Sequence, residues 1–476
     1  MTEFDEVYYE KLLDGLEIQE ILYSELEFSG RIDAEYYQKT YLAYEEIIHK
    51  CRNDRLHHLA DFLIGPFGSA YDTNNYTDVP DFRYVRGQDV KPFVLKDTEA
   101  RYMTEKDFNR LSKYSLKADD ILVSVVGTLG NACIVRKKDI PAIFSCKSTV
   151  IRTNVVNPYF LTAYLNSKYG RNLLLRKERG VIQKGLNLDD LKMLDVPLFS
   201  NKFQNVCEKF INEAWELMDA SADVYKKAEE LLIEKFGLKN FAPQTERFSV
   251  KSFKNSFGDV GRLDAEFYQK KYDDLFVRLS KFNCKKLGDI VTMKKSIEPG
   301  SDSYSDTGIP FVRVSDITKY GITKPKIKLP HQLVENMQDL FPAKGTILLT
   351  KDGSVGIAYK VEEDKHFITS SALLHLHVLD DNEVNPDYLT LVLNSKAVQM
   401  QAERNAGGSI IQHWKPSEIE DVIIPILDTD IQNKVSDKVR KSFILRKESQ
   451  ILLGRAITLV ETAIEQGEDV ALKLYV

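Results

Sequence analysis

Two stretches of this sequence, about 230 residues apart, are nearly identical. The first reads Gly30-Arg31-Ile32-Asp33-Ala34-Glu35-Tyr36-Tyr37-Gln38-Lys39, and the second reads Gly261-Arg262-Leu263-Asp264-Ala265-Glu266-Phe267-Tyr268-Gln269-Lys270. We call this stretch the signature. Further matches follow in the same order: Tyr84-Val85-Arg86 with Phe311-Val312-Arg313, Ile121–Gly130 with Ile347–Gly356, Leu165–Lys168 with Leu393–Lys396, and Val196–Leu198 with Ile424–Ile426. Because an internal repeat makes each copy form the same unit, the sequence predicts two diverged copies of one domain.

The length and composition agree with two ordinary globular domains. A chain of 476 residues exceeds one usual core, and each half is long enough to bury its own. Hydrophobic residues make up 43% and charged residues 29%, without an apolar run that could span a membrane. The five cysteines are scattered, and the acidic N-terminus lacks the apolar core of a signal peptide, so we expect a cytoplasmic protein.

Basic residues gather in the same part of each copy, although the formal net charge is -6. Residues 51–200 carry an excess of Lys and Arg, and residues 281–330 carry another. A repeated basic stretch favours a nucleic-acid partner, while a merely solvated face is the alternative for either stretch taken alone.

The local patterns predict a mixed α/β unit. An apolar run at Ile18–Tyr23 suggests a short strand, and each signature is expected to open a helix, to about Lys50 or Phe282, with Asp33 placed to cap the first. Short β-rich runs separated by turn residues follow from about 55 to 200. The Gly127-x-x-Gly130 and Gly353-x-x-Gly356 pairs lack the spacing of a phosphate-binding loop and predict tight turns between strands.

No catalytic or metal-binding constellation stands out. Asp81 with Asp89 and Lys91 has the residue types of a nuclease, but in the second copy only Asp316 corresponds. His375 and His377 lie on one face of an expected strand without a third ligand at suitable spacing. We therefore expect a protein that is not an enzyme and that holds neither metal nor cofactor.

A long helix is expected after each domain, over residues 201–236 and 429–466, with Gly237 and Gly467 ending them. Large and small residues alternate in rows at heptad spacing, in the same register in both helices. This pattern predicts two helices packed closely against each other, although each could instead pack only on its own domain. The residues expected to form the packing are Phe203, Ala214, Leu217, Ser221, Ala228, Ile431, Ser442, Leu445, Ser449 and Ala456.

The order of domain, long helix, similar domain and second long helix, with a signature before each domain, resembles the specificity subunits of type I restriction-modification systems. The resemblance implies an α+β fold with an internal pseudo-twofold repeat, in which two mixed α/β target-recognition domains are separated by an antiparallel, coiled-coil-like helix pair. The implied parts are residues 1–50 as lead and signature helix, 51–200 as target-recognition domain 1, 201–236 as central helix, 237–282 as linker and second signature helix, 283–428 as target-recognition domain 2, 429–467 as C-terminal helix and 468–476 as tail.

The resemblance also implies the function and the partners. Each domain would read one half of a split double-stranded DNA target, and the helices would set the gap. Two methyltransferase subunits that bind S-adenosylmethionine would methylate adenine, and restriction subunits would translocate and cut DNA with ATP and Mg²⁺. A repeat-built scaffold that binds no DNA, or a specificity subunit of a related methylation-dependent defence system, are the alternatives.

Basic residues within or near the matched stretches are the candidates for DNA contact. They are Arg83, Arg86, Lys147, Arg179, Lys184, Lys294, Lys295, Arg313, Lys351, Arg404 and Lys415. Most would bind phosphates and a few would read bases. For Arg86 and Arg313 the alternative is an ion pair with the nearby Asp89 or Asp316.

Overall fold

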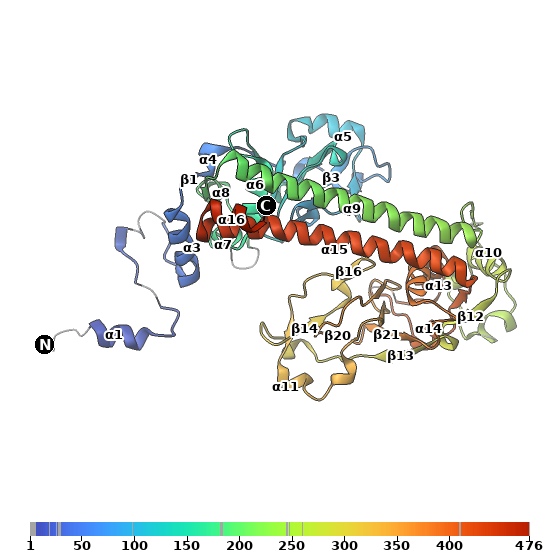
Figure 1. Cartoon of the computed structure of the whole chain (residues 1–476). Coiled ribbons are helices and arrows are strands. Elements are labelled where there is room, and N and C mark those ends of the chain that lie inside the picture. The colour runs from blue at the N-terminus through green and yellow to red at the C-terminus, as the bar shows by residue number, and fades with distance from the viewer. Residues whose placement is uncertain are drawn as a thin grey trace. The chain divides into compact units, whose positions relative to one another are not determined.

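The computed structural model describes residues 6–18, 20–24, 26, 30–97, 99–180, 184–243, 246, 248–258, 260–408 and 411–475. The chain forms two compact units, which Figure 1 shows in one view: unit 1 comprises residues 1–217 and 448–476, and unit 2 comprises residues 218–447. Among the described residues, none of the helices combines the length and the apolar character needed to cross a membrane.

Unit 1 contains short helices, short strands and parts of two long helices. Its helices are α1 (Glu6–Leu13), α3 (Lys39–Lys50), α4 (Leu56–Leu59), α5 (Glu105–Arg110), α6 (Pro158–Asn166), α7 (Lys168–Leu175), α8 (Leu188–Lys192), the first part of α9 (Asn201–Lys235), the last part of α15 (Thr429–Gln466) and α16 (Glu468–Tyr475). Its strands are β1 (Asn53–Arg55), β2 (Asp61–Ile64), β3 (Arg83–Val85), β4 (Val90–Lys91), β5 (Val94–Leu95), β6 (Arg101–Tyr102), β7 (Ile121–Ser124), β8 (Ala132–Ile134), β9 (Ala142–Phe144), β10 (Ser148–Arg152) and β11 (Asp195–Pro197).

Unit 2 contains the same kinds of element in the same order. Besides the remaining parts of α9 and α15, its helices are α10 (Lys270–Leu279), α11 (His331–Val334), α12 (Pro386–Leu393), α13 (Lys396–Asn405) and α14 (Pro416–Glu420). Its strands are β12 (Cys284–Lys286), β13 (Val291–Lys295), β14 (Ile309–Val312), β15 (Ile317–Thr318), β16 (Gly321–Ile322), β17 (Lys328–Leu329), β18 (Ile347–Thr350), β19 (Ala358–Lys360), β20 (Ile368–Thr369), β21 (Leu373–Val378) and β22 (Ile423–Pro425).

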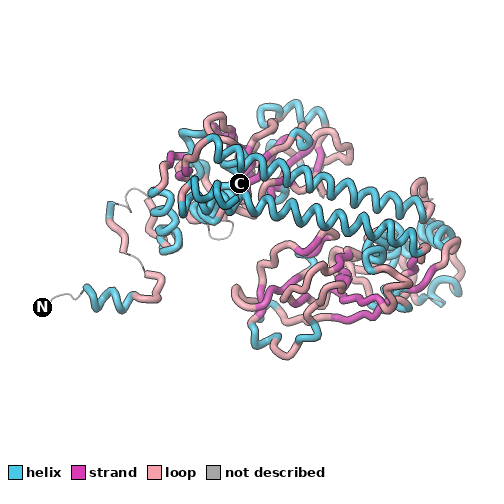
Figure 2. Tube along the Cα trace, in the orientation of Figure 1, coloured by secondary structure: helices cyan, strands magenta, loops and turns pink. Residues whose placement is uncertain are grey.

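The sheets confirm the internal repeat. Unit 1 has a four-stranded sheet in the order β2-β10-β7-β8 and unit 2 has one in the order β13-β21-β18-β19. Each unit adds a three-stranded sheet, β6-β3-β9 or β17-β14-β20, a two-stranded hairpin, β4-β5 or β15-β16, and a closing pair, β1-β11 or β12-β22. Helices and strands are interspersed within each unit, as Figure 2 shows, so the predicted mixed α/β class is correct.

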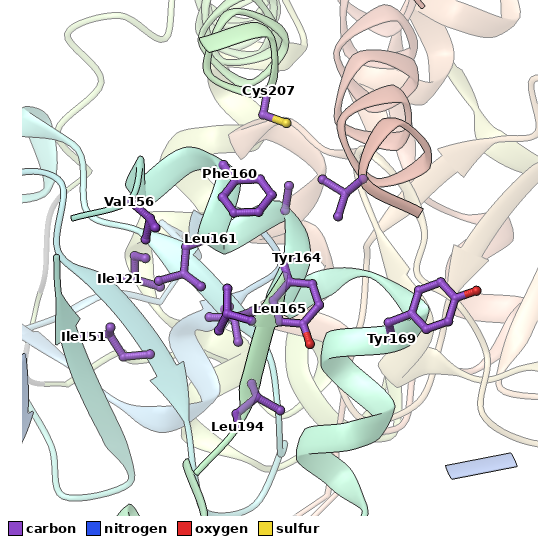
Figure 3. Close-up of a cluster of buried hydrophobic side chains, with 14 of the residues drawn as sticks. Ile121, Ile151, Val156, Phe160, Leu161, Tyr164, Leu165, Tyr169, Leu194 and Cys207 are labelled. Carbon is purple, nitrogen blue, oxygen red and sulfur yellow. The ribbon is translucent and has the colours of Figure 1, made fainter. Parts of the chain in front are cut away.

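One apolar helix is buried in the core of each unit. In unit 1 Phe160, Leu161 and Leu165 of α6 lie among buried residues of the sheet, such as Ile121 and Ile151 (Figure 3). Pro158 starts this helix and the Asn157 side chain accepts hydrogen bonds from its first amides, as Asn385 does for α12. Both Asn-Pro pairs are therefore helix starts.

Each signature folds as a short 3₁₀ turn, so the expected start of each helix is wrong. Residues Ala34–Tyr37 and Ala265–Tyr268 form 3₁₀ turns, and regular helix begins only at Lys39 and Lys270. Asp33 and Asp264 make no capping hydrogen bond, because their carboxylates pair with Arg31 and Arg262 two residues earlier. The expected strand at Ile18–Tyr23 is also wrong, since the described residues there form no strand.

An arginine, buried in unit 1 and half-buried in unit 2, holds each signature in place. The Arg176 guanidinium stacks 4.1 Å from the Tyr36 ring centroid and donates to the Tyr36 carbonyl oxygen at 2.6 Å. Arg404, at the matching place in unit 2, lies 3.7 Å from the Phe267 ring centroid and donates to the Phe267 carbonyl oxygen at 3.3 Å. Burial lowers the pKa of the Arg404 guanidinium. The signature is therefore a structural connection between the helix that follows it and the end of α7 or α13.

Replacing Arg404 with methionine should destabilise unit 2 by about 2 to 4 kcal/mol, because it removes a cation–π contact and leaves a carbonyl group without its partner. Thermal unfolding of the purified chain measures the loss. Lys415, whose side chain is 75% exposed, provides the matched control: Lys415→Met should leave the unfolding temperature almost unchanged. Equal unfolding temperatures for the two variants would show that Arg404 does not hold the signature in place.

Helices α9 and α15 run antiparallel and touch within each unit. In unit 2 the Ser221 and Ser442 hydroxyls lie 3.0 Å apart, and each donates to the other residue's carbonyl oxygen, at 2.8 and 2.9 Å. One heptad away, in unit 1, the Ser449 hydroxyl donates to the Ala214 carbonyl oxygen at 2.6 Å. Contacts between a hydroxyl and the backbone of a facing helix require close approach, which explains why small residues occupy these positions.

The expected packing residues divide into two groups. Seven are buried: Phe203 and the six residues of the small row, Ala214, Ser221, Ala228, Ser442, Ser449 and Ala456. Among the large residues, Phe203 belongs to the core of unit 1, with its ring centroid 4.7 Å from that of Phe199, while Leu217, Ile431 and Leu445 are half-buried. The helices thus pack against each other through the small row, and α9 packs on its own domain through Phe203.

Candidate nucleic-acid interface

Five connections meet at one end of the four-stranded sheet in unit 1. The turn after β7 is joined to the turn after β9, because the Lys147 carbonyl oxygen accepts from the amides of Val125 and Val126 at 2.9 and 3.3 Å. The loop after α7 also joins it, through the Leu186 amide bonded to the Val125 carbonyl oxygen at 2.9 Å. We call the surface formed by residues 65–67, 86–88, 125–130, 145–147 and 179–186 the loop face of unit 1, of which residues 181–183 lie outside the described part.

Glycines allow the remaining connections to come this close. A Cβ at Gly65 would lie 2.4 Å from the Ser145 carbonyl oxygen, and a Cβ at Gly87 would lie 2.8 Å from the Lys147 Cβ. Each position therefore excludes any larger residue without a shift of the backbone. The segments after β2 and β3 are thus held directly against the turn that carries Lys147.

Unit 2 has a matching loop face, formed by residues 296–298, 313–315, 351–356, 370–372 and 406–414, with residues 409 and 410 outside the described part. The Lys351 amide donates to the Ala372 carbonyl oxygen at 2.9 Å, and the Trp414 amide donates to the Lys351 carbonyl oxygen at 2.8 Å. The Ser371 amide donates to the Ile297 carbonyl oxygen at 2.7 Å. The repeat therefore reproduces this surface together with the fold.

The glycine pairs form the tight turns that the sequence predicts. Gly127 and Gly130 have φ values of 86° and 71°, and Gly353 and Gly356 have 72° and 83°. These values lie in the left-handed region that favours glycine. Each turn connects neighbouring strands, β7 to β8 and β18 to β19, and presents its tip on the loop face.

Eight of the eleven candidate cations lie on or directly beside these loop faces. They are Arg86, Lys147, Arg179 and Lys184 in unit 1 and Lys295, Arg313, Lys351 and Lys415 in unit 2. Lys147 and Lys295 are exposed, and no carboxylate of the described residues lies within ion-pair distance of either. These two lysines have the clearest geometry for phosphate contact.

The other cations on the loop faces already have acidic partners. Arg179 pairs with Asp190 at 2.9 Å, Lys184 pairs with Glu178, and Lys351 pairs with Asp352. The more exposed pairs of Arg179 and Lys184 contribute little to stability, so these two cations are available to a phosphate that competes for them. The Lys351 side chain is only 12% exposed and is held by Asp352.

The two matched arginines differ from each other. Arg86 makes two hydrogen bonds to the buried Asp89 carboxylate, at 2.7 and 3.0 Å, and these bonds raise the pKa of Arg86. Arg313 is only 4.0 Å from Asp316, and its side chain is 41% exposed. The alternative of a local ion pair therefore describes Arg86 fully and Arg313 only weakly, because 4.0 Å is a long distance for an ion pair.

Three candidates lie elsewhere, and Lys415 borders the loop face of unit 2 at the start of α14. Arg83 is buried and pairs with Asp97 at 3.1 Å, and Arg404 is stacked on Phe267 of the second signature. Lys294 pairs with Asp339 and holds the pKa of that carboxyl below its ordinary value. Lys415 precedes α14 and lies 3.8 Å from Glu418. Arg83 and Arg404 are not surface cations in this structure, because burial and local partners commit both guanidinium groups.

Sequence reasoning missed several exposed residues on these faces. In unit 1 it missed Phe67, and in unit 2 it missed Ile411 and His413, whose ring nitrogen lies 2.8 Å from the Asp352 carboxylate. Only their position beside the glycine turns could have revealed them, because neutral side chains add nothing to a charge pattern.

One group of possible metal ligands, Glu45, His49 and Asp195, occurs among the described residues. Arginines neutralise both carboxylates: Arg176 lies 2.8 Å from Glu45, and Arg55 lies 3.1 Å from Asp195. This arrangement is that of a structural ion-pair network.

His375 is a core residue. It is buried and bonded to the Thr369 hydroxyl at 2.8 Å, and burial lowers its pKa to about 4. A histidine with that pKa and that partner is neutral and structural.

Comparison with known protein families gives a match within unit 2. Residues 280–444 match the family model described as the type I restriction modification DNA specificity domain. No curated protein matches the chain. Among solved structures, the chain is similar to the S subunit of a type I restriction-modification system from M. genitalium, with 14% identity over 87% of this chain and 94% of that chain and a TM-score of 0.39.

Two further solved structures are similar. One is the HsdS subunit from Thermoanaerobacter tengcongensis, with 16% identity, coverage of 87% of this chain and 97% of that chain, and a TM-score of 0.28. The other comes from work on complex assembly and conformational transition of the type I R-M system, with 16% identity, coverage of 88% and 97%, and a TM-score of 0.28. At TM-scores this low, these likenesses add nothing to the family match.

Proposed function

We propose a function from the premise that this chain belongs to the specificity family of type I restriction-modification systems, given the match at residues 280–444 and the repetition of its elements in unit 1. Each unit reads one half of a two-part DNA target with its loop face, and the α9–α15 pair sets the gap between the halves. The repeated loop face, with an exposed lysine on it in unit 1 and directly beside it in unit 2, is the observation that supports this function best.

The chemistry of a loop face suits the reading of DNA. Lysines and arginines bind phosphates and fix the position of the protein on the duplex, while neutral and polar tips reach the edges of the bases. Lys147 and Lys295 supply the first kind of contact, and the tips of the glycine turns supply the second. Because the two loop faces differ in their side chains, the two half-sites differ in sequence.

The chain supplies recognition and its partners supply the reactions. Two methyltransferase subunits, one for each copy of the repeat, bind S-adenosylmethionine and methylate adenine, and restriction subunits use ATP and Mg²⁺ to translocate and cut DNA. A specificity subunit of a related methylation-dependent defence system would share the recognition step and differ in the partners that co-purify with it.

Removing either exposed lysine should weaken DNA binding in a salt-dependent manner. For Lys147→Ala and for Lys295→Ala we expect lower affinity at low salt, and a slope of log K against log salt that is smaller by about 1. Titration of a labelled duplex with the chain bound to its methyltransferase partners, at several salt concentrations, measures both.

Lys294→Ala is the matched control, because Lys294 is the neighbour of Lys295 but is paired with Asp339. It should change the slope much less. Equal slopes for the wild-type complex and the Lys147 and Lys295 variants would remove the loop faces from the DNA interface. A wild-type complex without salt-dependent DNA binding would instead favour a repeat-built scaffold.

The target itself follows from mapping methylated adenines in a host that expresses the chain with its partner subunits. The proposed function predicts one two-part sequence with a fixed gap. Methylation at a continuous, undivided sequence would contradict the assignment of one half-site to each unit.

A further inference from the structure

One aromatic side chain on the loop face of unit 1 is almost fully in solvent. Phe67 is 84% exposed, and Ile64, just before it, is 48% exposed. A single exposed apolar residue is ordinary on a protein surface, so exposure alone indicates nothing. The surroundings of Phe67 are what distinguish it.

The backbone on both sides of Phe67 is fixed. Gly65 is pressed against the Ser145 carbonyl oxygen so closely that a Cβ would lie 2.4 Å from it. Pro66 restricts its own φ angle, and the Phe67 carbonyl oxygen accepts from the Ala70 amide at 2.8 Å to start the 3₁₀ turn Gly68–Ala70. The ring therefore projects from a rigid support.

An apolar core lies next to Phe67 along the chain, yet Phe67 is not part of it. Tyr71 and Tyr84 stack with ring centroids 4.7 Å apart in a cluster with Met103, Leu111 and Ile143. The same segment thus buries Tyr71 while it leaves Phe67 in solvent. Burying a phenylalanine ordinarily favours the folded state by about ten- to 150-fold, and the fold forgoes this gain at Phe67.

We infer that Phe67 is a stacking wedge, which contacts the faces of DNA bases in the half-site read by unit 1. Gly65 lies against Ser145, and the exposed Lys147 follows two residues later in that turn, so a phosphate-binding cation lies on the same surface as Phe67. Aromatic and apolar side chains beside such cations stack on bases or enter a base step and partly unstack it. In unit 2 the matching 3₁₀ turn, Ser301–Ser303, follows Gly300, so the wedge belongs to unit 1 alone.

This inference rests on the proposed function and is tested on the chain bound to its methyltransferase partners. The probe is a duplex that carries the methylation site mapped for the wild-type system, with 2-aminopurine placed singly at each position of each half-site. We expect the wild-type complex to change the 2-aminopurine emission at one step of one half-site. Phe67→Ala should abolish that change and weaken binding about five- to 150-fold, with an unchanged salt slope, because a stack releases no counterions.

Two further variants make the result decisive. Phe67→Trp keeps an aromatic face and should keep the emission change, and Phe253→Ala removes a ring that is 71% exposed but distant in sequence from both loop faces, so it should have no effect. Wild-type emission and affinity in Phe67→Ala would overturn the wedge, and so would loss of the methyltransferase partners instead of DNA contact. If the wild-type complex itself fails to bind the duplex, the proposed function fails first, and the salt titration of the lysine variants shows this separately.

Discussion

Replacing Ser221 and Ser442 together with leucine is expected to destabilise the chain by about 2 to 6 kcal/mol, since overpacking a close contact costs about 1 to 3 kcal/mol per site. The two hydroxyls lie 3.0 Å apart and each reaches the carbonyl oxygen of the facing helix, so this position has no room for a larger side chain. Thermal or denaturant unfolding of the purified chain measures the loss, and site-specific methylation should be abolished with it.

Alanine at the same two positions is the matched control. It fits the available space and removes only the hydroxyls, whose hydrogen bonds contribute about 0.5 to 1.5 kcal/mol each. The leucine pair should therefore be clearly less stable than the alanine pair. Equal stability of the leucine and alanine variants would show that the two helices are not in close contact at this level.

The sequence predicts the repeat and the small row of the helix pair because both are periodic. Matches such as Ile121–Gly130 with Ile347–Gly356 reappear as the same pair of strands around the same turn. The spacing of Ala214 and Ser221 appears as successive contacts along one face of α9. Periodic features can be predicted from one sequence because each position supports the others.

The roles of individual cations could not be predicted in the same way. Arg404 and Lys147 are both basic residues within or near the matched stretches. Arg404 is stacked on Phe267, whereas Lys147 is exposed beside the turn after β7. The difference depends on partners that are distant in the chain. The same reason explains the signature, whose Asp33 has the position of a helix cap but is bound by Arg31, and Phe67, which no charge pattern marks.

Lengthening both helices by four residues is expected to lengthen the DNA gap without changing either half-site. The insertion repeats residues 218–221 in α9 and 442–445 in α15, which face each other around the Ser221–Ser442 contact. Four residues add about 6 Å of helix at about 1.5 Å per residue. DNA rises about 3.4 Å per base pair, so the gap should grow by about one to two base pairs.

Insertion into only one helix is the control. It shifts the small residues of one helix relative to those of the other, so that Ser442 no longer faces Ser221. This variant should therefore lose both stability and methylation. The comparison separates an effect of length from an effect of disturbed packing, because both variants carry the same inserted residues in α9.

The central claim is that the two units read separate half-sites and that the helix pair sets their distance. Its most direct test is the spacing of methylated adenines in a host that expresses the variant with both helices lengthened, together with its partner subunits. If the helix pair sets the distance, the methylated site should contain the same two half-sites, separated by a gap about one to two base pairs longer. An active variant that methylates the original site with the original gap would contradict it.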